Sequence, residues 1–377
     1  MEIPRFYGDL GQYIEKGRVL VIFGPRRVGK TTIIQEYLQT TKFRYKFDIG
    51  DELSIRHIFG SLDFSQIHEY VTDNELIVID EAHMIPDIGR GLKILVDRMP
   101  EIRVIVSGSS SFELAGQVGE PLTGRKNTLV LYPIAQLELA GTNNIYDLKK
   151  SLPERLVYGS YPQIVVAESN ARRIKLLEEL TESYLLKDIL TIDKIKNSKL
   201  LLDLLRLMAF QVGSEVSHSE LGNQLGTNKK TIGRYLDLLE KSFILYNLRG
   251  YSRNLREEVT RKSKYYFYDN GVRNAIISNF NAIDQRNDIG ALWENFLMME
   301  RIKYRSYKSI YSNVFFWRTW DQKEIDCVEE REGKLFGYEF KWSGQGGKHA
   351  NAWRAAYPNA EFEVISKDNY LRYISNY

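Results

Sequence analysis

The chain has 377 residues, more than a single hydrophobic core usually serves, and this length favours two or three domains. Hydrophobic residues make up 43% of the sequence and charged residues 27%, which excludes the disordered and collagen-like classes. The single cysteine, Cys327, excludes an intrachain disulfide, so a reducing, cytoplasmic compartment is expected. Neither an export signal nor a run of about 18 apolar residues is visible, and no membrane partner is expected. A net charge of +3 is too small to indicate a nucleic-acid partner by itself.

The first third of the chain alternates short apolar strands with helical patterns, which predicts a parallel sheet covered by helices. Five strands are expected there, at residues 19–23, 43–47, 76–79, 104–106 and 128–132. Apolar residues at helical spacing then predict a helical lid or linker over 136–205. Further strands are expected at 243–248, 264–268, 314–317, 324–328, 336–341 and 361–365. The predicted fold class is α/β, with four parts at 1–135, 136–205, 206–285 and 286–377.

Residues 24–31 read Gly-Pro-Arg-Arg-Val-Gly-Lys-Thr, between an expected strand and an expected helix, and match the phosphate-binding P-loop. The glycines let backbone N–H groups curl around phosphate oxygens, and the helix directs its positive dipole end at them. Lys30 supplies a positive charge, and the Thr31 hydroxyl is a ligand for Mg²⁺. ATP and Mg²⁺ are therefore the expected cofactors. The residues predicted to bind the nucleotide are Gly24, Pro25, Arg26, Arg27, Val28, Gly29, Lys30, Thr31 and Thr32.

A second motif, residues 76–81, is an apolar strand that ends in two carboxylates, Asp80 and Glu81. Ligands of open α/β sheets bind at this carboxyl edge. Asp80 is predicted to hold Mg²⁺ through water, together with Thr31. Glu81 is predicted to orient and deprotonate the attacking water. The alternative interpretation is that both acids cap the next helix.

The run Asp80-Glu81-Ala82-His83 also spells a helicase motif. A helicase of that kind needs a second P-loop-like domain, and none follows in the sequence. An ordinary helix residue is an equally good interpretation of His83.

Residues 217–236 predict a helix-turn-helix, with Gly226 in the turn and Asn228 as the cap of the second helix. The two strands that follow complete the pattern of a winged helix. Residues 228–264 contain ten Lys or Arg against four Asp or Glu, a local balance of +6. Contacts with DNA phosphates are predicted for Lys229, Lys230 and Arg234. The alternative is a protein-binding or architectural module.

The last part of the chain places Glu294 on an expected helix, Asp326 on a strand, and Glu339 with Lys341 on the next strand. Glu339 and Lys341 are two positions apart, so both side chains project from one face of their strand. This constellation resembles the core of the PD-(D/E)XK nucleases. The resemblance implies a second Mg²⁺ site in which the lysine steadies water or phosphate. A folded but inert domain of this type is the alternative.

The strand at 43–47, between the two ATP-site motifs, points to the AAA-plus branch of P-loop proteins. Residues 104–111 look like the sensor strand of that family, which implies that Ser109 senses the γ-phosphate; a helix cap is the alternative. Arg125 precedes the fifth strand and could neutralise phosphate charge in its own site or in that of a neighbouring copy. Only the second alternative requires a homo-oligomer. A solvated surface arginine is the alternative.

The whole chain resembles a bacterial and archaeal family of predicted AAA-plus ATPases fused to a carboxyl-terminal domain of unknown function. Residues 158–162 and 268–271 also carry the resemblance. It implies an AAA-plus type sheet with a helical lid, a winged helix and a small restriction-endonuclease-like domain. Three functions are compatible with this order: an ATP-driven switch acting on DNA, an ATP-licensed metal-dependent nuclease, and a protein-interaction module that holds ATP without turnover.

Overall fold

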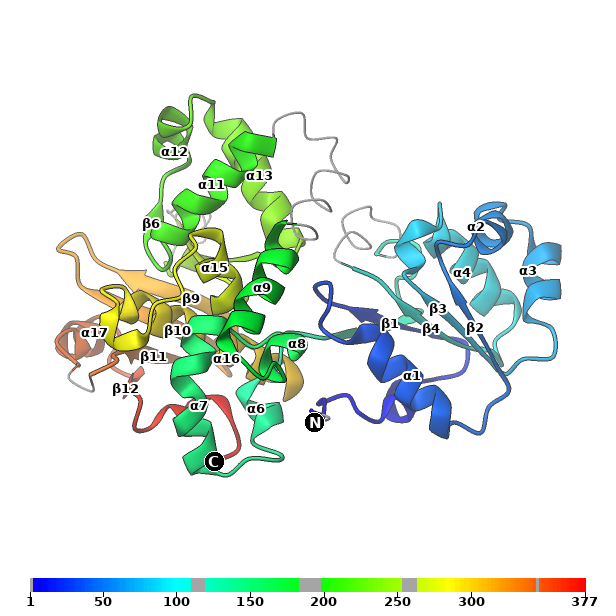
Figure 1. The fold of residues 1–377 in the computed structure, drawn as a ribbon, viewed down its shortest axis with the longest axis horizontal. Helices are drawn as coiled ribbons and strands as arrows, with labels where there is room; N and C mark the ends of the chain where they lie inside the picture. The colour runs from blue at the N-terminus through cyan, green and yellow to red at the C-terminus, as the bar shows by residue number, and fades with distance from the viewer. Residues whose placement is uncertain (1–2, 110–118, 183–197, 253–262, 344–345) are drawn as a thin grey trace. The chain divides into compact units, whose positions relative to one another are not determined.

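The protein is described by a computed structural model at residues 3–109, 119–182, 198–252, 263–343 and 346–377 (Figure 1). The chain forms two compact units. The first unit holds Arg5–Tyr132 and the short segment Lys241–Phe243. The second unit holds Pro133–Glu240, Ile244–Tyr377 and the residues before Arg5. The boundary after Tyr132 lies close to the predicted one, whereas the three parts predicted beyond it belong to one unit.

The first unit is built on a five-stranded sheet in the order β2-β3-β4-β1-β5, in which every pair of neighbours is parallel. The strands are β1 (Val19–Phe23), β2 (Tyr45–Ile49), β3 (Leu76–Asp80), β4 (Arg103–Ser107) and β5 (Lys126–Val130). All five predicted strands are present, and their ends move by no more than two residues. This parallel sheet confirms the predicted α/β fold class and is typical of P-loop proteins.

Helices accompany this sheet: α1 (Lys30–Thr40), α2 (Leu53–Gly60), α3 (Phe64–Val71) and α4 (Ile88–Arg98). Strands β1 and β3 are buried along their whole length, which explains why their sequences are continuous apolar runs rather than alternating patterns. In the sheet β4 lies between β1 and β3, although it follows both in sequence. Because the strands are parallel, the carboxyl ends of β1, β4 and β3 lie side by side.

The second unit begins with helices and continues as a mixed sheet. Its helices are α6 (Gln136–Leu139), α7 (Ile145–Tyr158), α8 (Pro162–Val165), α9 (Asn170–Leu180), α11 (Ser198–Phe210), α12 (His218–Gln224), α13 (Lys229–Lys241), α15 (Asn270–Ile276), α16 (Ile289–Tyr307), α17 (Ala350–Ala356) and α18 (Tyr370–Ile374). Both helices of the predicted helix-turn-helix are present, as α12 and α13. No helix among the described residues is long and apolar enough to cross a membrane.

One seven-stranded sheet runs through the second unit in the order β12-β11-β10-β9-β7-β8-β6. Its strands are β6 (Glu215–Val216), β7 (Leu245–Gly250), β8 (Ser263–Phe267), β9 (Asn313–Arg318), β10 (Glu324–Arg331), β11 (Lys334–Phe340) and β12 (Glu361–Ile365). Strand β7 pairs with β9 in parallel, Arg249 opposite Phe315. The sheet therefore crosses the boundary predicted at residues 285 and 286 without a break.

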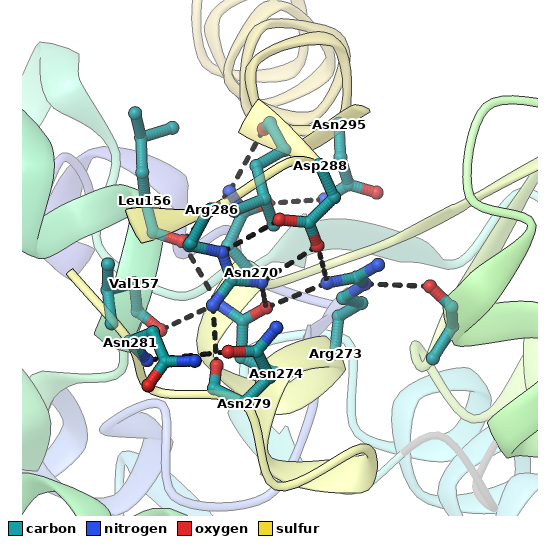
Figure 2. A network of polar contacts seen from close by, with 12 residues as sticks. Leu156, Val157, Asn270, Arg273, Asn274, Asn279, Asn281, Arg286, Asp288 and Asn295 are labelled. Atoms are coloured by element: carbon teal, nitrogen blue, oxygen red, sulfur yellow. Dashed lines mark hydrogen bonds and ion pairs between the residues drawn. The ribbon is translucent and has the colours of Figure 1, made fainter. Parts of the chain in front are cut away.

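Asn274 is the centre of a buried polar network in this unit (Figure 2). Its amide nitrogen donates to the carbonyls of Leu156, at 3.1 Å, and Val157, at 2.8 Å, which end α7. Its amide oxygen accepts from Arg273 and Arg286, each at 3.1 Å. A single amide therefore satisfies two carbonyls at a helix end and orients two guanidinium groups.

Two glycine-containing turns, 158–162 and 268–271, meet around the buried carboxylate of Asp269. This carboxylate accepts from the backbone N–H groups of Ser160, at 2.7 Å, and Gly271, at 2.9 Å. A Cβ atom at Gly159 would lie 1.9 Å from the carboxylate, and one at Gly271 would lie 2.1 Å from the Tyr158 carbonyl oxygen. Both positions therefore require glycine, which gives a packing reason for the two motifs.

We predict that Asn274→Ala destabilises the second unit by at least about 2 kcal/mol, because several buried polar groups lose their partner at once. The measurement is urea unfolding of the full chain followed by near-ultraviolet circular dichroism. Asn281→Ala is the matched control, since Asn281 is exposed and takes part in the network only through its backbone N–H. Equal unfolding midpoints for both variants would contradict this role of Asn274.

Candidate functional site

The P-loop lies between β1 and α1, and its two glycines hold backbone conformations that other residues rarely adopt. Gly24 has φ 146°, and a Cβ atom there would lie 2.0 Å from the carbonyl oxygen of Leu131. Gly29 has φ 96° and stands immediately before α1 as its N-cap. The tight path of the loop therefore depends on both glycines.

Lys30 is the first residue of α1 and is only 5% exposed. Its ammonium group donates to the carbonyls of Gly24, at 3.0 Å, and Pro25, at 2.9 Å. The positive charge is thus held inside the loop, close to the amino-terminal end of α1. Both features attract an anion to this point.

Thr31 and Asp80 come together although 48 residues separate them in the sequence. The Thr31 hydroxyl donates to the Asp80 carboxylate at 2.6 Å. Asp80 is 4% exposed and also accepts from the Ser107 hydroxyl and, at 3.1 Å, from the backbone N–H of Glu81. Hydroxyl and carboxylate oxygens are hard ligands of the kind that Mg²⁺ prefers. This pair, the loop and Lys30 fit a nucleotide phosphate with its divalent cation.

No sequence pattern marks Ser107, whereas the resemblance to a sensor strand points to Ser109, two residues further along. Ser107 ends β4, and because β4 lies between β1 and β3, its hydroxyl reaches Asp80. Ser109 is also buried, two residues beyond the strand, and its sensor role stays a prediction. Residues 110 and 111 of the predicted sensor segment lie outside the described residues.

Glu81 follows β3 in a left-handed backbone conformation, with φ 50°, which turns the chain at the carboxyl edge of the sheet. His83 Nδ1 lies 3.1 Å from the carboxylate Oε2 of Glu81. Burial alone would raise the pKa of Glu81, but His83, Lys30 and Arg26 outweigh burial and hold that pKa below its usual value. His83 therefore contacts the predicted water-activating carboxylate, a role that its motif did not indicate.

Arg125 lies outside the nucleotide site of its own chain. It precedes β5 at the amino-terminal edge of the sheet, where its carbonyl accepts from the backbone N–H of Val19. The P-loop begins at the opposite edge, five strand residues away, which is about 17 Å. The Arg125 guanidinium pairs instead with Asp97. This position does not favour an action within one chain, and a role of Arg125 in a neighbouring copy stays a prediction.

A further arginine, Arg5, bonds to the P-loop from outside the motif. One of its guanidinium nitrogens donates to the carbonyl of Val28, and the other donates at 2.7 Å to the carbonyl of Tyr132. Tyr132 is the last residue of this part of the first unit. Arg5 therefore ties the backbone of the loop to the point where the chain leaves the sheet. No motif marks this residue, because the contact bridges more than 100 positions.

The second predicted site also forms a cluster, but with an unforeseen member. Lys264 on β8 lies between the carboxylates of Glu294 on α16 and Glu324 on β10. Its side chain is 2% exposed, and its ammonium nitrogen is 3.3 Å from Glu294. Burial alone would lower the pKa of Lys264, but the carboxylates raise it above its usual value. The cluster thus contains its own buried cation.

Asp326 on β10 interacts electrostatically with Lys264, and Glu339 on β11 and Lys341, directly after β11, come from the adjacent strand. The carboxylate of Asp326 accepts from the backbone N–H of Phe340 at 2.7 Å, and burial together with Glu294 raises its pKa. Glu339 pairs with Lys341 at 3.1 Å. Among the described residues, no group of three or more His, Cys, Asp or Glu side chains is arranged to hold a metal ion. The predicted metal role of these carboxylates stays a prediction.

The predicted DNA contacts share one helix. Lys229, Lys230 and Arg234 are exposed on α13, and Asn228 accepts from the backbone N–H of Thr231 at 2.9 Å, as the predicted cap does. Gly226 has φ 65°, as the turn between α12 and α13 requires. Residues 253–262, between the two strands of the predicted winged helix, lie outside the described residues.

Three family models match consecutive parts of the chain. One described as an AAA domain matches residues 16–140. Two described as domains of unknown function, DUF8612 and DUF4143, match residues 149–282 and 289–372. The first match supports a P-loop ATPase type of domain, and none of the three spans half of the chain.

Curated relatives are similar along most of the chain. An uncharacterized protein of Mycobacterium tuberculosis is 27% identical over 88% of this chain and 72% of its own length. One of Haemophilus influenzae is 24% identical over 87% of this chain and 83% of its own length. A solved structure of Pif1 helicases at forked DNA is 13% identical over 48% of this chain and 52% of its own, with a TM-score of 0.26. That score is too low to carry an argument.

We predict that Arg5→Ala weakens binding of a fluorescent ATP analogue about tenfold, because a hydrogen bond from a charged group to the loop is lost. Arg18→Ala is the matched control, since Arg18 lies in the same unit and pairs with the exposed Glu15. Fluorescence anisotropy measures the affinity. Unchanged affinity in Arg5→Ala would show that the loop keeps its shape without this bond.

Proposed function

We propose that this chain binds Mg-ATP in its first unit and hydrolyses it as a switch. The observation that carries this proposal is the meeting of Lys30, Thr31 and Asp80 at one edge of the parallel sheet, with Ser107 beside them. The AAA-domain match over residues 16–140 supports it independently. In this proposal Mg²⁺ neutralises charge on the phosphates when it is bound with ATP.

The residues of the chain take separate parts in the proposed reaction. The loop from Gly24 to Thr32 surrounds the phosphates, and the Lys30 ammonium offsets their charge. Thr31 and Asp80 hold the metal, and the Ser107 hydroxyl keeps the Asp80 carboxylate in its orientation. Glu81, ionised at neutral pH and in contact with His83, orients the attacking water and accepts its proton.

The switch is proposed to act on DNA through α13. Lys229, Lys230 and Arg234 are exposed there, and the segment 228–264 carries a local charge balance of +6. Phosphate contacts by such side chains favour binding without regard to base sequence. ATP turnover would then change how the second unit holds DNA.

We predict that Glu81→Gln lowers the rate of multiple-turnover phosphate release about 100-fold or more, while ATP binding is kept. Lys30→Ala is expected to lose binding as well. Release is measured with and without duplex DNA and Mg²⁺. Equal, negligible phosphate release from the wild type and Glu81→Gln would contradict the proposed switch and favour a module that holds ATP without turnover.

We predict that the substitutions Lys229→Ala, Lys230→Ala and Arg234→Ala each weaken DNA binding similarly for all sequences. Each is expected to reduce the slope of log affinity against log salt by about 1. Anisotropy titrations of duplex DNA at several salt concentrations measure this slope. Lys150→Ala, an exposed lysine on α7, is the control. A slope that none of the three variants alters would indicate that α13 does not face DNA.

A further inference from the structure

Lys264 joins two parts of the seven-stranded sheet that lie far apart in it. The lysine belongs to β8, whereas Glu324 belongs to β10, and β7 and β9 stand between these strands. The long side chain crosses this face of the sheet with its nitrogen 5.4 Å from the ring centroid of Phe316 on β9. The ammonium group therefore lies among carboxylates that come from α16 and β10.

The carboxylates around the lysine already have partners within the chain. Glu294 accepts from the Tyr266 hydroxyl at 2.8 Å as well as from Lys264. Glu324 pairs with Lys264 and lies 3.6 Å from Arg318. These donors face Oε1 of Glu294 and both oxygens of Glu324. A divalent cation would also meet a buried positive charge at short range.

The two neighbouring acidic residues, Asp326 and Glu339, also accept hydrogen bonds or form ion pairs within the chain. One oxygen of Asp326 accepts from the Phe340 backbone, and both oxygens of Glu339 have partners, Lys341 at 3.1 Å and the backbone N–H of Gly347 at 2.8 Å. Buried carboxylates are tolerated only with such compensation. The cluster is therefore compensated by hydrogen bonds and by internal cations.

We propose that Lys264 is the permanent counter-ion of this cluster, taking the place of the divalent metal that a PD-(D/E)XK nuclease would hold there. The cluster then takes up no Mg²⁺ and performs no strand cleavage. Instead it fastens β8 to α16 and β10 by ion pairs. This inference is independent of ATP hydrolysis, since it concerns the second unit alone.

The first test asks whether the cluster binds metal when Lys264 is present. Mn²⁺ is titrated into the nucleotide-free full chain and followed by electron paramagnetic resonance. Every protein in this test also carries Asp80→Asn, which removes the predicted metal ligand of the first unit. We expect that adding Asp326→Asn changes nothing in the Mn²⁺ titration. A saturable Mn²⁺ site that Asp326→Asn abolishes would overturn the proposal, and so would Mg²⁺-dependent DNA nicking that the same substitution removes.

The second test removes the internal cation, again in the Asp80→Asn chain. Lys264→Met keeps the length of the side chain, and we expect a lower Tm that millimolar Mn²⁺ partly restores. This restoration should vanish in the double variant Lys264→Met with Asp326→Asn. A Lys264→Met protein as stable as its parent, or one whose Tm ignores Mn²⁺, would contradict the counter-ion role. If Lys264→Met does not fold, the titration of the chain that keeps Lys264 still decides between the outcomes.

Discussion

The hydrogen bond from the Thr31 hydroxyl to Asp80 joins the start of α1 to the end of β3. The arrangement of the phosphate loop and the acidic strand end in the first unit depends on this contact. It forms only because β1 and β3 are parallel members of one sheet, with β4 between them. The intervening strand places the Ser107 hydroxyl against the same carboxylate. The buried carboxylate thus fixes the relation between the phosphate loop and the acidic strand end, since an uncompensated charge at that depth would be costly.

Elements with strong local patterns could be predicted from the sequence. The strands at β1 and β3 are apolar runs buried on both faces, and the functional residues of the first unit stand directly at their ends. The loop glycines and the Asn228 cap are equally local, because each depends on a few neighbouring backbone atoms. Such features need no knowledge of the tertiary fold.

Features that depend on distant contacts could not be predicted. Arg5 meets the loop through a carbonyl of Tyr132, and Lys264 meets Glu324 across two intervening strands. Neither Arg5 nor Lys264 belongs to a sequence motif whose spacing would indicate its contact. The edge of the sheet that Arg125 occupies likewise depends on a distant contact, because it follows from the parallel pairing of β5 with β1. The pairing of Arg249 with Phe315, which joins β7 and β9 in one sheet, also has no local mark in the sequence.

That pairing also limits how the protein can be taken apart. A fragment that ended at residue 285 would remove the strand partners of Arg249 and Gly250 on β7, and a fragment that began at residue 286 would remove those of Phe315 and Phe316 on β9. Each new edge would present unpaired backbone groups next to buried aromatic residues such as Phe315 and Phe316. Open edges of this kind recruit strands from other molecules. Isolated halves of the second unit are therefore expected to aggregate more readily than a chain that keeps β7 and β9 together.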